Sequence, residues 1–317
     1  MPGPTHRTLG DLRVTTVGLG CNNFGGRVDL EGTRAVVDAA LAAGVSFFDT
    51  ADIYGGQGGS EELLGQALAG RRDEVVLATK FGMDMKGANG EPAGPRGSAA
   101  YVRQAVEASL RRLRVDTIDL YQYHAPDGVT PIEETLAALD ELVREGTVRC
   151  VGCSNFSAAQ LAEAAEIAER EGFSGFVSLQ NEYSLLEREI EREVVPECRR
   201  LGVGVLPYFP LASGLLTGKY RRGVEAPAGT RLHGRGDVTD AETFARLEAL
   251  AEFARDRGLE MIDVAIGGLA AQPAVASVIA GATKPEQVQA NAHAARWSPS
   301  AEDLAALDAI VPPPRAA

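Results

Sequence analysis

The sequence of 317 residues predicts an α/β fold, namely a (β/α)8 barrel of the TIM type. Short apolar runs alternate with amphipathic segments from residue 17 to the end of the chain. Eight such runs can be distinguished, and several of the amphipathic segments end at a glycine just before the next run. Because repeated strand–helix alternation favours a barrel over an open doubly wound sheet, we expect one barrel domain over residues 1–317.

The eight candidate strands are hydrophobic along nearly their whole length and rich in β-branched and aromatic residues. This composition is typical of parallel strands that are covered on both faces. The predicted strands are residues 17–20, 46–49, 75–80, 118–124, 148–154, 177–180, 203–208 and 277–281.

The segments between these strands have helical periodicity. In residues 132–145 apolar side chains recur on one face, and residues 244–254 repeat the pattern. The sequences LAAG, VREG and RRLG each end a helical segment directly before a strand, which is the short connection of a repeating unit.

Three segments depart from this alternation. Residues 7–16 predict a β-hairpin with a turn at Gly10 and Asp11, placed before the first barrel strand. Residues 82–98 and 212–241 predict extended loops after the third and seventh barrel strands. Both loops follow strands, so we expect them on the carboxyl-end face, where barrel active sites are built.

Composition limits the classes of function. The chain has 31 basic and 44 acidic residues, a net charge of −13, which argues against nucleic-acid binding. No apolar run is long enough for a membrane helix, and the first residues lack an apolar secretory core. Four cysteines are too few to cross-link a fold of this size. We therefore expect a cytoplasmic protein with a small-molecule substrate, and the oligomeric state stays open.

Polar residues lie at or just beyond the ends of three neighbouring strands. They are Asp49, Tyr54, Lys80 and His124. Lys80 is one of only four lysines, and it ends an otherwise apolar run. An ammonium group beside a phenol would lower the pKa of Tyr54 from its ordinary value of about 10, and histidine could orient a substrate carbonyl or relay a proton.

Other interpretations of these residues stay open at this point. A strand-end aspartate or histidine can simply cap a neighbouring helix. Lys80 can also form a Schiff base, as in barrel aldolases. The Cys150–Cys153 spacing is formally that of a redox pair, but residues three apart on a strand point to opposite faces, so we expect inert thiols. The four histidines lack metal-ligand spacing, so no metal site is expected.

The chain resembles the aldo-keto reductase superfamily in seven motifs that occur in the family's order and spacing. These are FFDTADIYG, LATKFG, DLYQYHAPD, VGCSNFS, LQNEYSLLERE, GVLPYFPLASGLLTGKY and VIAGATKPEQVQAN. The resemblance covers residues 8–296 and is greatest for the bacterial short-loop branch related to potassium-channel β-subunits. It implies reduction of an aldehyde or ketone by NAD(P)H, with Asp49, Tyr54, Lys80 and His124 as a catalytic tetrad and Tyr54 as general acid.

The resemblance also implies how the cofactor would be held. Ser154, Asn155 and Gln180 match residues that bind the nicotinamide carboxamide, and Tyr208 matches the aromatic residue stacked on the ring. The remaining matches surround the phosphates and the adenosine: Leu211, Ser213, Gly214, Leu215, Lys219, Gly281, Thr283, Lys284, Gln287 and Asn291. Glycine-rich loops and helix starts suit phosphate because their amides donate hydrogen bonds.

Two details of specificity follow from the same resemblance. Gln287 stands where some relatives have an arginine near the 2′-phosphate, and Thr283 and Lys284 could replace that contact, so NADPH is expected with NADH as an alternative. Asn22, Asn23 and Phe24 are expected to line the substrate mouth. A cofactor-binding regulatory or sensor subunit with slow redox activity is the alternative function.

Overall fold

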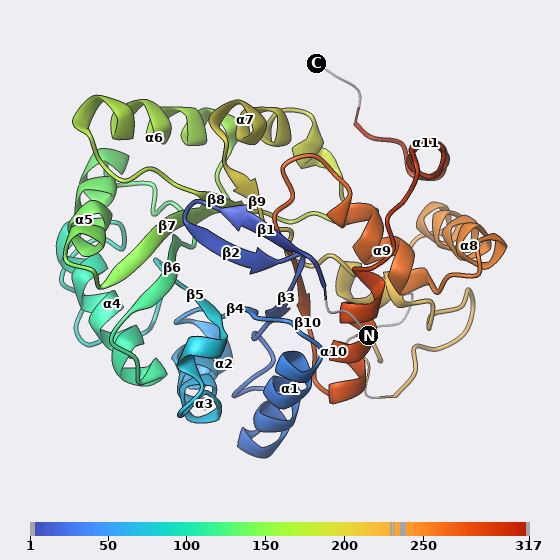
Figure 1. Cartoon of the computed structure of the whole chain (residues 1–317), viewed down its shortest axis with the longest axis horizontal. Coiled ribbons are helices and arrows are strands. Elements are labelled where there is room, and N and C mark those ends of the chain that lie inside the picture. Colours follow the sequence, from blue (N-terminus) through green and yellow to red (C-terminus); the bar gives the residue numbers. More distant parts are fainter. Residues whose placement is uncertain (1–3, 229, 231, 235–238, 315–317) are drawn as a thin grey trace.

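The computed structural model describes residues 4–228, 230, 232–234 and 239–314. Within them the chain forms the predicted barrel of parallel strands ringed by helices (Figure 1). The eight-stranded sheet has the order β10-β3-β4-β5-β6-β7-β8-β9. Its strands are β3 (Val17–Gly20), β4 (Phe47–Asp49), β5 (Val76–Phe81), β6 (Ile118–Tyr123), β7 (Val148–Ser154), β8 (Ser178–Gln180), β9 (Gly204–Val205) and β10 (Val278–Gly281).

The barrel closes where β9 approaches β10. Val205 forms a parallel bridge with Val275, and the Ile279 N–H donates to the Pro207 carbonyl at 3.0 Å. Strand β9 is shorter than the predicted run 203–208. Pro207 has no N–H to donate to a ladder, and Tyr208 instead bridges to Glu182.

Helices follow the strands in the predicted alternation. The predicted helix 132–145 is α5, and the glycine of RRLG ends α7 with a φ of 70°. No helix in the described ranges is both long and apolar enough to cross a membrane. The helices are α1 (Leu30–Ala42), α2 (Tyr54–Gln57), α3 (Gly59–Ala67), α4 (Ala99–Leu113), α5 (Ile132–Arg144), α6 (Ala158–Glu171), α7 (Val194–Leu201), α8 (Ala241–Asp256), α9 (Met261–Ala270), α10 (Pro285–Ala294) and α11 (Ala301–Ile310), with 3-10 turns η1 (Arg72–Glu74), η2 (Glu189–Glu191) and η3 (Ala212–Thr217).

The predicted N-terminal hairpin covers the amino end of the barrel (Figure 1). It consists of β1 (His6–Leu9) and β2 (Leu12–Thr15), joined at Gly10 and Asp11. Its buried side chains pack on the first inward-facing residues of the barrel strands. This basal apolar layer contains Leu9, Leu12, Val14, Phe47, Ala78, Leu120, Cys150, Leu206, Ala276 and Ile279.

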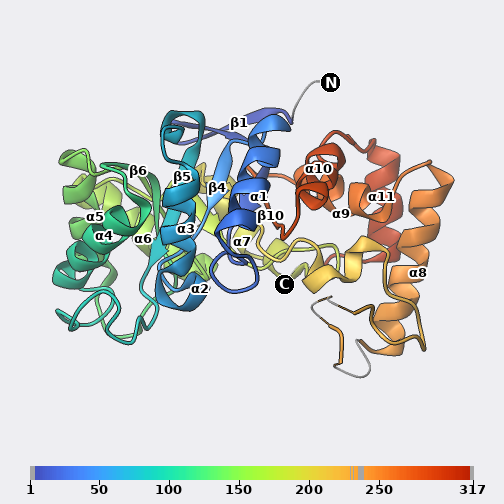
Figure 2. The ribbon, with the colours of Figure 1, turned by 90° about the horizontal axis from the view of Figure 1, so that it is seen from below.

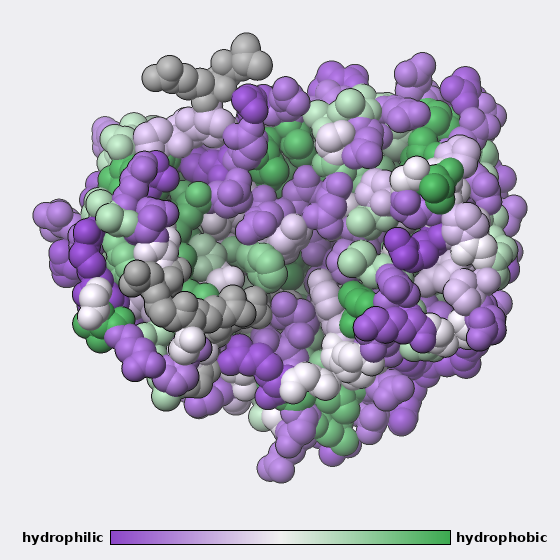
Figure 3. Space-filling view, turned by 180° about the vertical axis from the view of Figure 1, so that it is seen from behind, coloured by the Kyte–Doolittle hydropathy of each residue, from purple (hydrophilic) through white to green (hydrophobic). Residues whose placement is uncertain are grey.

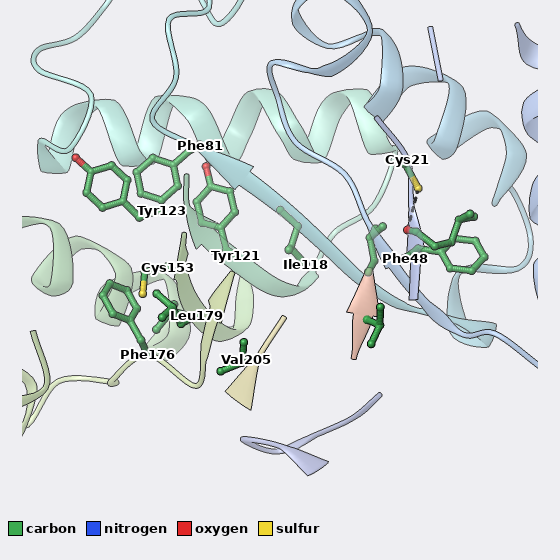
Figure 4. Close-up of a cluster of buried hydrophobic side chains, with 14 of the residues drawn as sticks. Cys21, Phe48, Phe81, Ile118, Tyr121, Tyr123, Cys153, Phe176, Leu179 and Val205 are labelled. Atoms are coloured by element: carbon green, nitrogen blue, oxygen red, sulfur yellow. Dashed lines mark hydrogen bonds between the residues drawn. The ribbon is translucent and has the colours of Figure 1, made fainter. Parts of the chain in front are cut away.

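A second, larger apolar layer lies between the strands and the surrounding helices. Phe81 stacks on Tyr121 and Tyr123, with ring centroids 4.8 and 5.1 Å apart, and Figure 4 shows the three rings side by side. Successive residues of a strand point to opposite faces. Phe81 therefore anchors β5 to the helical layer, while its neighbour Lys80 points into the barrel.

The two predicted loops lie at the carboxyl ends of the strands, opposite the hairpin (Figure 2). Residues 82–98 connect β5 to α4 without a helix or strand. Residues 212–241 begin with the turn η3 and lead to α8, and positions 229, 231 and 235–238 of this loop are outside the described residues. Figure 3 shows this face, where apolar side chains gather in a central hollow surrounded by hydrophilic ones.

The hairpin turn generates a stability prediction. Gly10 has a φ of +56°, and an added Cβ would lie 2.6 Å from Val177 Cγ1. Gly10→Ala should cost about 1–2 kcal/mol for the left-handed backbone and roughly 1–3 kcal/mol more for the clash. Gly202→Ala is the matched control, because its φ is +70° and an added Cβ meets no described atom within 4 Å. Urea unfolding should show the larger loss for Gly10→Ala, and equal losses would contradict the packing of hairpin against barrel.

Candidate active site

Four polar side chains from separate elements meet at the carboxyl end of the barrel. Asp49 ends β4, Lys80 lies in β5, Tyr54 begins α2, and His124 directly follows β6. Lys80 Nζ lies 2.7 Å from Asp49 Oδ2 and 3.5 Å from the Tyr54 hydroxyl. The rings of Tyr54 and His124 are perpendicular, with centroids 5.9 Å apart. The structure thus places the four sequence-predicted residues in one cluster.

The alternation of side chains along each strand explains why this cluster is inside the barrel. Phe47, Ala78 and Leu120 belong to the basal apolar layer above the hairpin. Two residues later on the same three strands stand Asp49, Lys80 and Gln122, which therefore point to the same interior. A polar layer consequently lies directly on an apolar one, away from the solvent at the amino end.

Lys80 and Asp49 form a fully buried ion pair, with 0% and 3% of their side chains exposed. The lysine ammonium has three N–H donors, and three acceptors surround it: Asp49 Oδ2, the Thr50 carbonyl at 2.9 Å, and the Tyr54 hydroxyl. A buried charge is tolerated when its hydrogen-bonding capacity is satisfied in this way. One lysine donor is therefore directed at the phenol.

The ion pair also decides between the proposed roles of Lys80. Burial lowers the pKa of Lys80, but the Asp49 carboxylate, with a smaller effect of Tyr54, raises it more, so the net shift is upward. A nucleophilic amine must be neutral. The Schiff-base interpretation of Lys80 is therefore disfavoured by its surroundings.

The expected lowering of the Tyr54 pKa is wrong in its net direction. Burial of the hydroxyl raises the pKa of Tyr54, and the opposing effect of the Lys80 ammonium is smaller. The sequence correctly indicated an ammonium neighbour, but it could not show how much water the phenol loses. A raised pKa keeps the phenol protonated near neutral pH, so it has a proton to donate.

His124 is neutral at physiological pH. Burial, followed by the Lys80 charge, lowers the pKa of His124 to about 3. Its Nδ1 atom is buried and has no hydrogen-bond partner among the described residues. An imidazole in this state can orient a carbonyl oxygen by donating a hydrogen bond, whereas proton relay through an imidazolium is unfavourable.

Three of the residues expected around a carboxamide are joined by hydrogen bonds at the ends of β7 and β8. The Ser154 hydroxyl donates to the backbone carbonyl of Gln180 at 2.6 Å. The Asn155 amide donates to the His124 carbonyl at 2.9 Å, and its Oδ1 accepts from the Tyr208 hydroxyl at 3.0 Å. These bonds fix the positions of the side chains beside the tetrad.

The expected phosphate-binding residues form a compact turn. Ala212, Ser213 and Gly214 have φ values of 45°, 57° and 99°, a succession of left-handed residues in η3. A Cβ added at Gly214 would lie 3.0 Å from Lys219 Nζ, so the ammonium group adjoins this turn. Leu211 and Leu215 are partly buried against the neighbouring apolar cluster. A positive charge beside a sharp turn is a suitable environment for phosphate.

The expected adenosine segment connects β10 to α10. Gly281 ends the strand, and α10 begins at Pro285, close to the predicted start. The Thr283 N–H donates to Gln287 Oε1 at 2.7 Å, which leaves the Gln287 NH2 group for other contacts. Lys284 is exposed at the helix start, whereas Asn291 is buried.

The structure differs from the expectation for the substrate mouth. Phe24 is fully buried in the core, and its backbone carbonyl lies 2.4 Å from where a Cβ of Gly55 would stand. Asn23 is 6% exposed and donates to the Ala282 carbonyl at 3.4 Å. Of the expected residues, Asn22 retains partial exposure. Phe24 therefore packs the turn that follows β3, an environment that the polar neighbours Asn22 and Asn23 did not reveal.

A buried polar cluster, which was not predicted from the sequence, adjoins the turn that carries Tyr54. Glu61 accepts from Arg112 Nε at 2.7 Å, and Arg112 also donates to Asn89 Oδ1 at 2.9 Å. Asn89 Nδ2 lies 3.4 Å from Asp52 Oδ2. Burial and then Glu61 raise the pKa of Asp52 to about 8. The cluster attaches loop 82–98 to the turn that carries Tyr54.

Gln122 is a further site residue that was not predicted from the sequence. It is fully buried in β6, and its Nε2 donates to Asp49 Oδ1 at 3.0 Å. Gln180 Nε2 donates to the same oxygen at 2.9 Å. An amide inside the apolar run LYQYH was the signal that could have identified it, because buried amides require partners.

The cysteines have the predicted environment. All four are free and buried, with Cys150 in the basal layer inside the barrel and Cys153 in the layer outside it. Burial raises the pKa of both thiols. Within the described ranges no group of three His, Cys, Asp or Glu side chains is arranged to hold a metal ion.

A parallel (β/α)8 barrel with a buried ion pair, a phenol and an imidazole at its carboxyl end defines the protein as one of the barrel oxidoreductase type. The chain belongs to the aldo/keto reductase family, whose model matches residues 16–312. The family resemblance and the fold expected from it are thereby confirmed.

Similar proteins are found in bacteria and plants. The chain is 38% identical over 310 residues to the uncharacterized oxidoreductase YrpG of Bacillus subtilis, covering 96% of this chain and 94% of that protein. It is 36% identical to a probable voltage-gated potassium channel subunit beta of Oryza sativa, covering 90% and 89%. It is 34% identical to the L-glyceraldehyde 3-phosphate reductase of Escherichia coli K12, covering 94% and 89%.

The ion pair generates a second stability prediction. Lys80→Met leaves the buried Asp49 carboxylate without its charged partner, which should cost roughly 3–5 kcal/mol in the free energy of unfolding. Adding Asp49→Asn removes that charge, so the double variant should regain part of the loss. Arg103→Met is the control, because the ion pairs of Arg103 with Glu141 and Glu145 are exposed, so its loss in stability should be much smaller. If single and double variants unfold at the same urea concentration, the interpretation of the pair is wrong.

Proposed function

We propose that this protein reduces an aldehyde or ketone to the corresponding alcohol with NADPH, NADH being the weaker alternative. The observation that carries the proposal is the lysine donor directed at the protonated phenol of Tyr54 beside a neutral imidazole. The names of the bacterial relatives, an uncharacterized oxidoreductase and an L-glyceraldehyde 3-phosphate reductase, support the same reaction class.

The residues around the tetrad suit a nicotinamide dinucleotide. Gln180 has an amide carbonyl that accepts no hydrogen bond from the described residues, so it can receive the carboxamide of the ring. Tyr208 is partly exposed beside Asn155 and can stack on the ring. The left-handed turn with Lys219 suits the pyrophosphate, and Thr283, Lys284, Gln287 and Asn291 suit the adenosine phosphate. When bound, this cofactor would supply the hydride that reduces the carbonyl carbon.

The chain itself supplies the proton and the environment for it. Tyr54 donates its hydroxyl proton to the carbonyl oxygen as negative charge develops there. The resulting phenolate lies next to the Lys80 ammonium, which stabilises it most when the charge is fully formed. Asp49 keeps this ammonium charged and in place. Neutral His124 donates a hydrogen bond to the same carbonyl oxygen and orients it toward Tyr54.

The cellular setting is part of the proposal. We place the protein in the cytoplasm, since its four cysteines are free thiols, as is usual in reducing compartments. Its net charge of −13 fits a small-molecule enzyme rather than a nucleic-acid-binding protein.

A regulatory or sensor subunit is the second candidate, because two plant relatives are named as probable potassium channel β-subunits. The two candidates differ in rate. Rapid mixing of the NADPH-loaded protein with a carbonyl panel that includes a phosphorylated aldehyde should give oxidation within seconds for an enzyme. Oxidation that takes hours would favour the sensor.

Replacement of the phenol tests the proposed acid. Tyr54→Phe should lower kcat roughly 10²–10⁴-fold, because it removes only the donated proton, and should leave NADPH affinity nearly unchanged. Steady-state loss of NADPH absorbance measures the first quantity, and calorimetric titration the second. Tyr101→Phe, which removes another buried phenol, is the control and should retain activity. Unchanged turnover in Tyr54→Phe would refute the role of Tyr54.

The pKa shifts predict the pH dependence of reduction. Tyr54 is protonated below its raised pKa, and His124 is neutral above about pH 3. Neither group therefore changes charge between about pH 6 and about pH 9, so kcat for carbonyl reduction should be constant over this interval. A decrease toward alkaline pH should begin only as the phenol ionises. An inflection near pH 6.5, the ordinary pKa of histidine, would contradict a neutral His124.

A further inference from the structure

Gln122 is a polar side chain in the sealed interior of the barrel. It lies in β6, where its register partners are Lys80 on β5 and Gly152 on β7. Its side chain is fully buried. A Cβ added at Gly152 would lie 2.1 Å from Ser178 Oγ and 3.3 Å from Gln122 Cγ, so the glycine mainly provides the space that Ser178 occupies next to the glutamine.

The hydrogen bonds of Gln122 connect two parts of the proposed site. Its Nε2 donates to Asp49 Oδ1 at 3.0 Å, and its Oε1 accepts from Gln180 Nε2 at 3.2 Å. Gln180 Nε2 also donates to Asp49 Oδ1 at 2.9 Å. Asp49, Gln122 and Gln180 therefore form a closed triangle of three hydrogen bonds beneath the rim.

The chemistry of the carboxylate allows only one orientation of this triangle. An ionised carboxylate accepts hydrogen bonds and donates none, so both amides must direct their NH2 groups at Asp49. The carbonyl of Gln122 is then directed at Gln180, where it takes the second N–H of that amide. Gln180 consequently has only its own carbonyl oxygen left for a ligand.

We propose that Gln122 is a positioning residue that fixes the Gln180 amide with its carbonyl oxygen toward the cofactor, so that the site recognises the NH2 group of the nicotinamide carboxamide. The same triangle occupies Asp49 Oδ1 and leaves Oδ2 for Lys80. Without Gln122, one amide proton of Gln180 would lose its acceptor, and only the bond to Asp49 would hold the Gln180 amide in this orientation. This inference rests on the proposed function.

A cofactor analogue tests the polarity directly. In the 3-acetylpyridine analogue of NADP+ a methyl group replaces the carboxamide NH2, so the donor is lost while the ring and phosphates remain. Calorimetric titration of the wild-type protein should give a dissociation constant roughly tenfold lower for NADP+ than for the analogue, the value of about one hydrogen bond. Gln122→Met, similar in size but without the amide, should lower this ratio, because Asp49 alone then holds the Gln180 amide in its orientation.

Two further variants separate positioning from packing. Gln122→Glu should regain the ratio as the pH falls from about 8 to about 5, because the protonated carboxyl can donate to Asp49 while its carbonyl accepts from Gln180. The wild-type ratio should be constant over the same interval. Ser178→Ala is the control, since Ser178 is buried in the same interior and its hydroxyl has no partner among the described residues. It should leave the ratio unchanged.

The outcomes distinguish the inference from the function on which it rests. A wild-type protein that binds neither NADP+ nor its analogue overturns the proposed function. A wild-type protein that binds both equally, or Gln122→Met with the full wild-type ratio, overturns the inference alone. A lower ratio in Gln122→Met together with its recovery in Gln122→Glu at low pH supports it.

Discussion

The buried pair of Lys80 and Asp49 is the interaction on which the rest of the site depends. Two opposite charges in a barrel interior cost a large desolvation energy, which is recovered only if every donor and acceptor finds a partner. The structure meets this condition at both ends of the pair. Thr50 and Tyr54 complete the acceptors around the ammonium, and Gln122 and Gln180 complete the donors around the carboxylate.

This requirement connects the architecture to the chemistry. The hairpin and the first inward-facing residues of the strands form an apolar layer that excludes water from below. The next inward-facing residues carry the ion pair and the amides, and Lys80 and Gln122 are register partners on β5 and β6. The charged groups of Lys80 and Asp49 are thereby fixed at one level of the barrel interior, and the Tyr54 phenol and the His124 imidazole lie nearer its carboxyl end. A site of this kind is preorganised, because the groups that stabilise a developing charge are already in place.

Burial also determines the protonation states of the two groups at the rim. It raises the pKa of Tyr54 and lowers that of His124, so both side chains are neutral near pH 7. A neutral phenol can give a proton, and a neutral imidazole can donate a hydrogen bond without competing for that proton. Desolvation thus outweighs the neighbouring ammonium at Tyr54, although that ammonium is the group that favours phenolate once the proton has left.

The sequence by itself determined the strand–helix order, the hairpin at Gly10, the two long loops and the residues at the strand ends, because these depend on local periodicity and turn chemistry. The strand predicted over residues 203–208 is longer than β9, because only the pairing of neighbouring strands shows that Pro207 and Tyr208 leave the ladder. Tertiary structure alone decided the burial of Phe24, the net pKa of Tyr54 and the partners of Gln122. The physical reason is that solvent exclusion and hydrogen-bond direction arise from side chains that are distant in the sequence and meet only when the barrel closes.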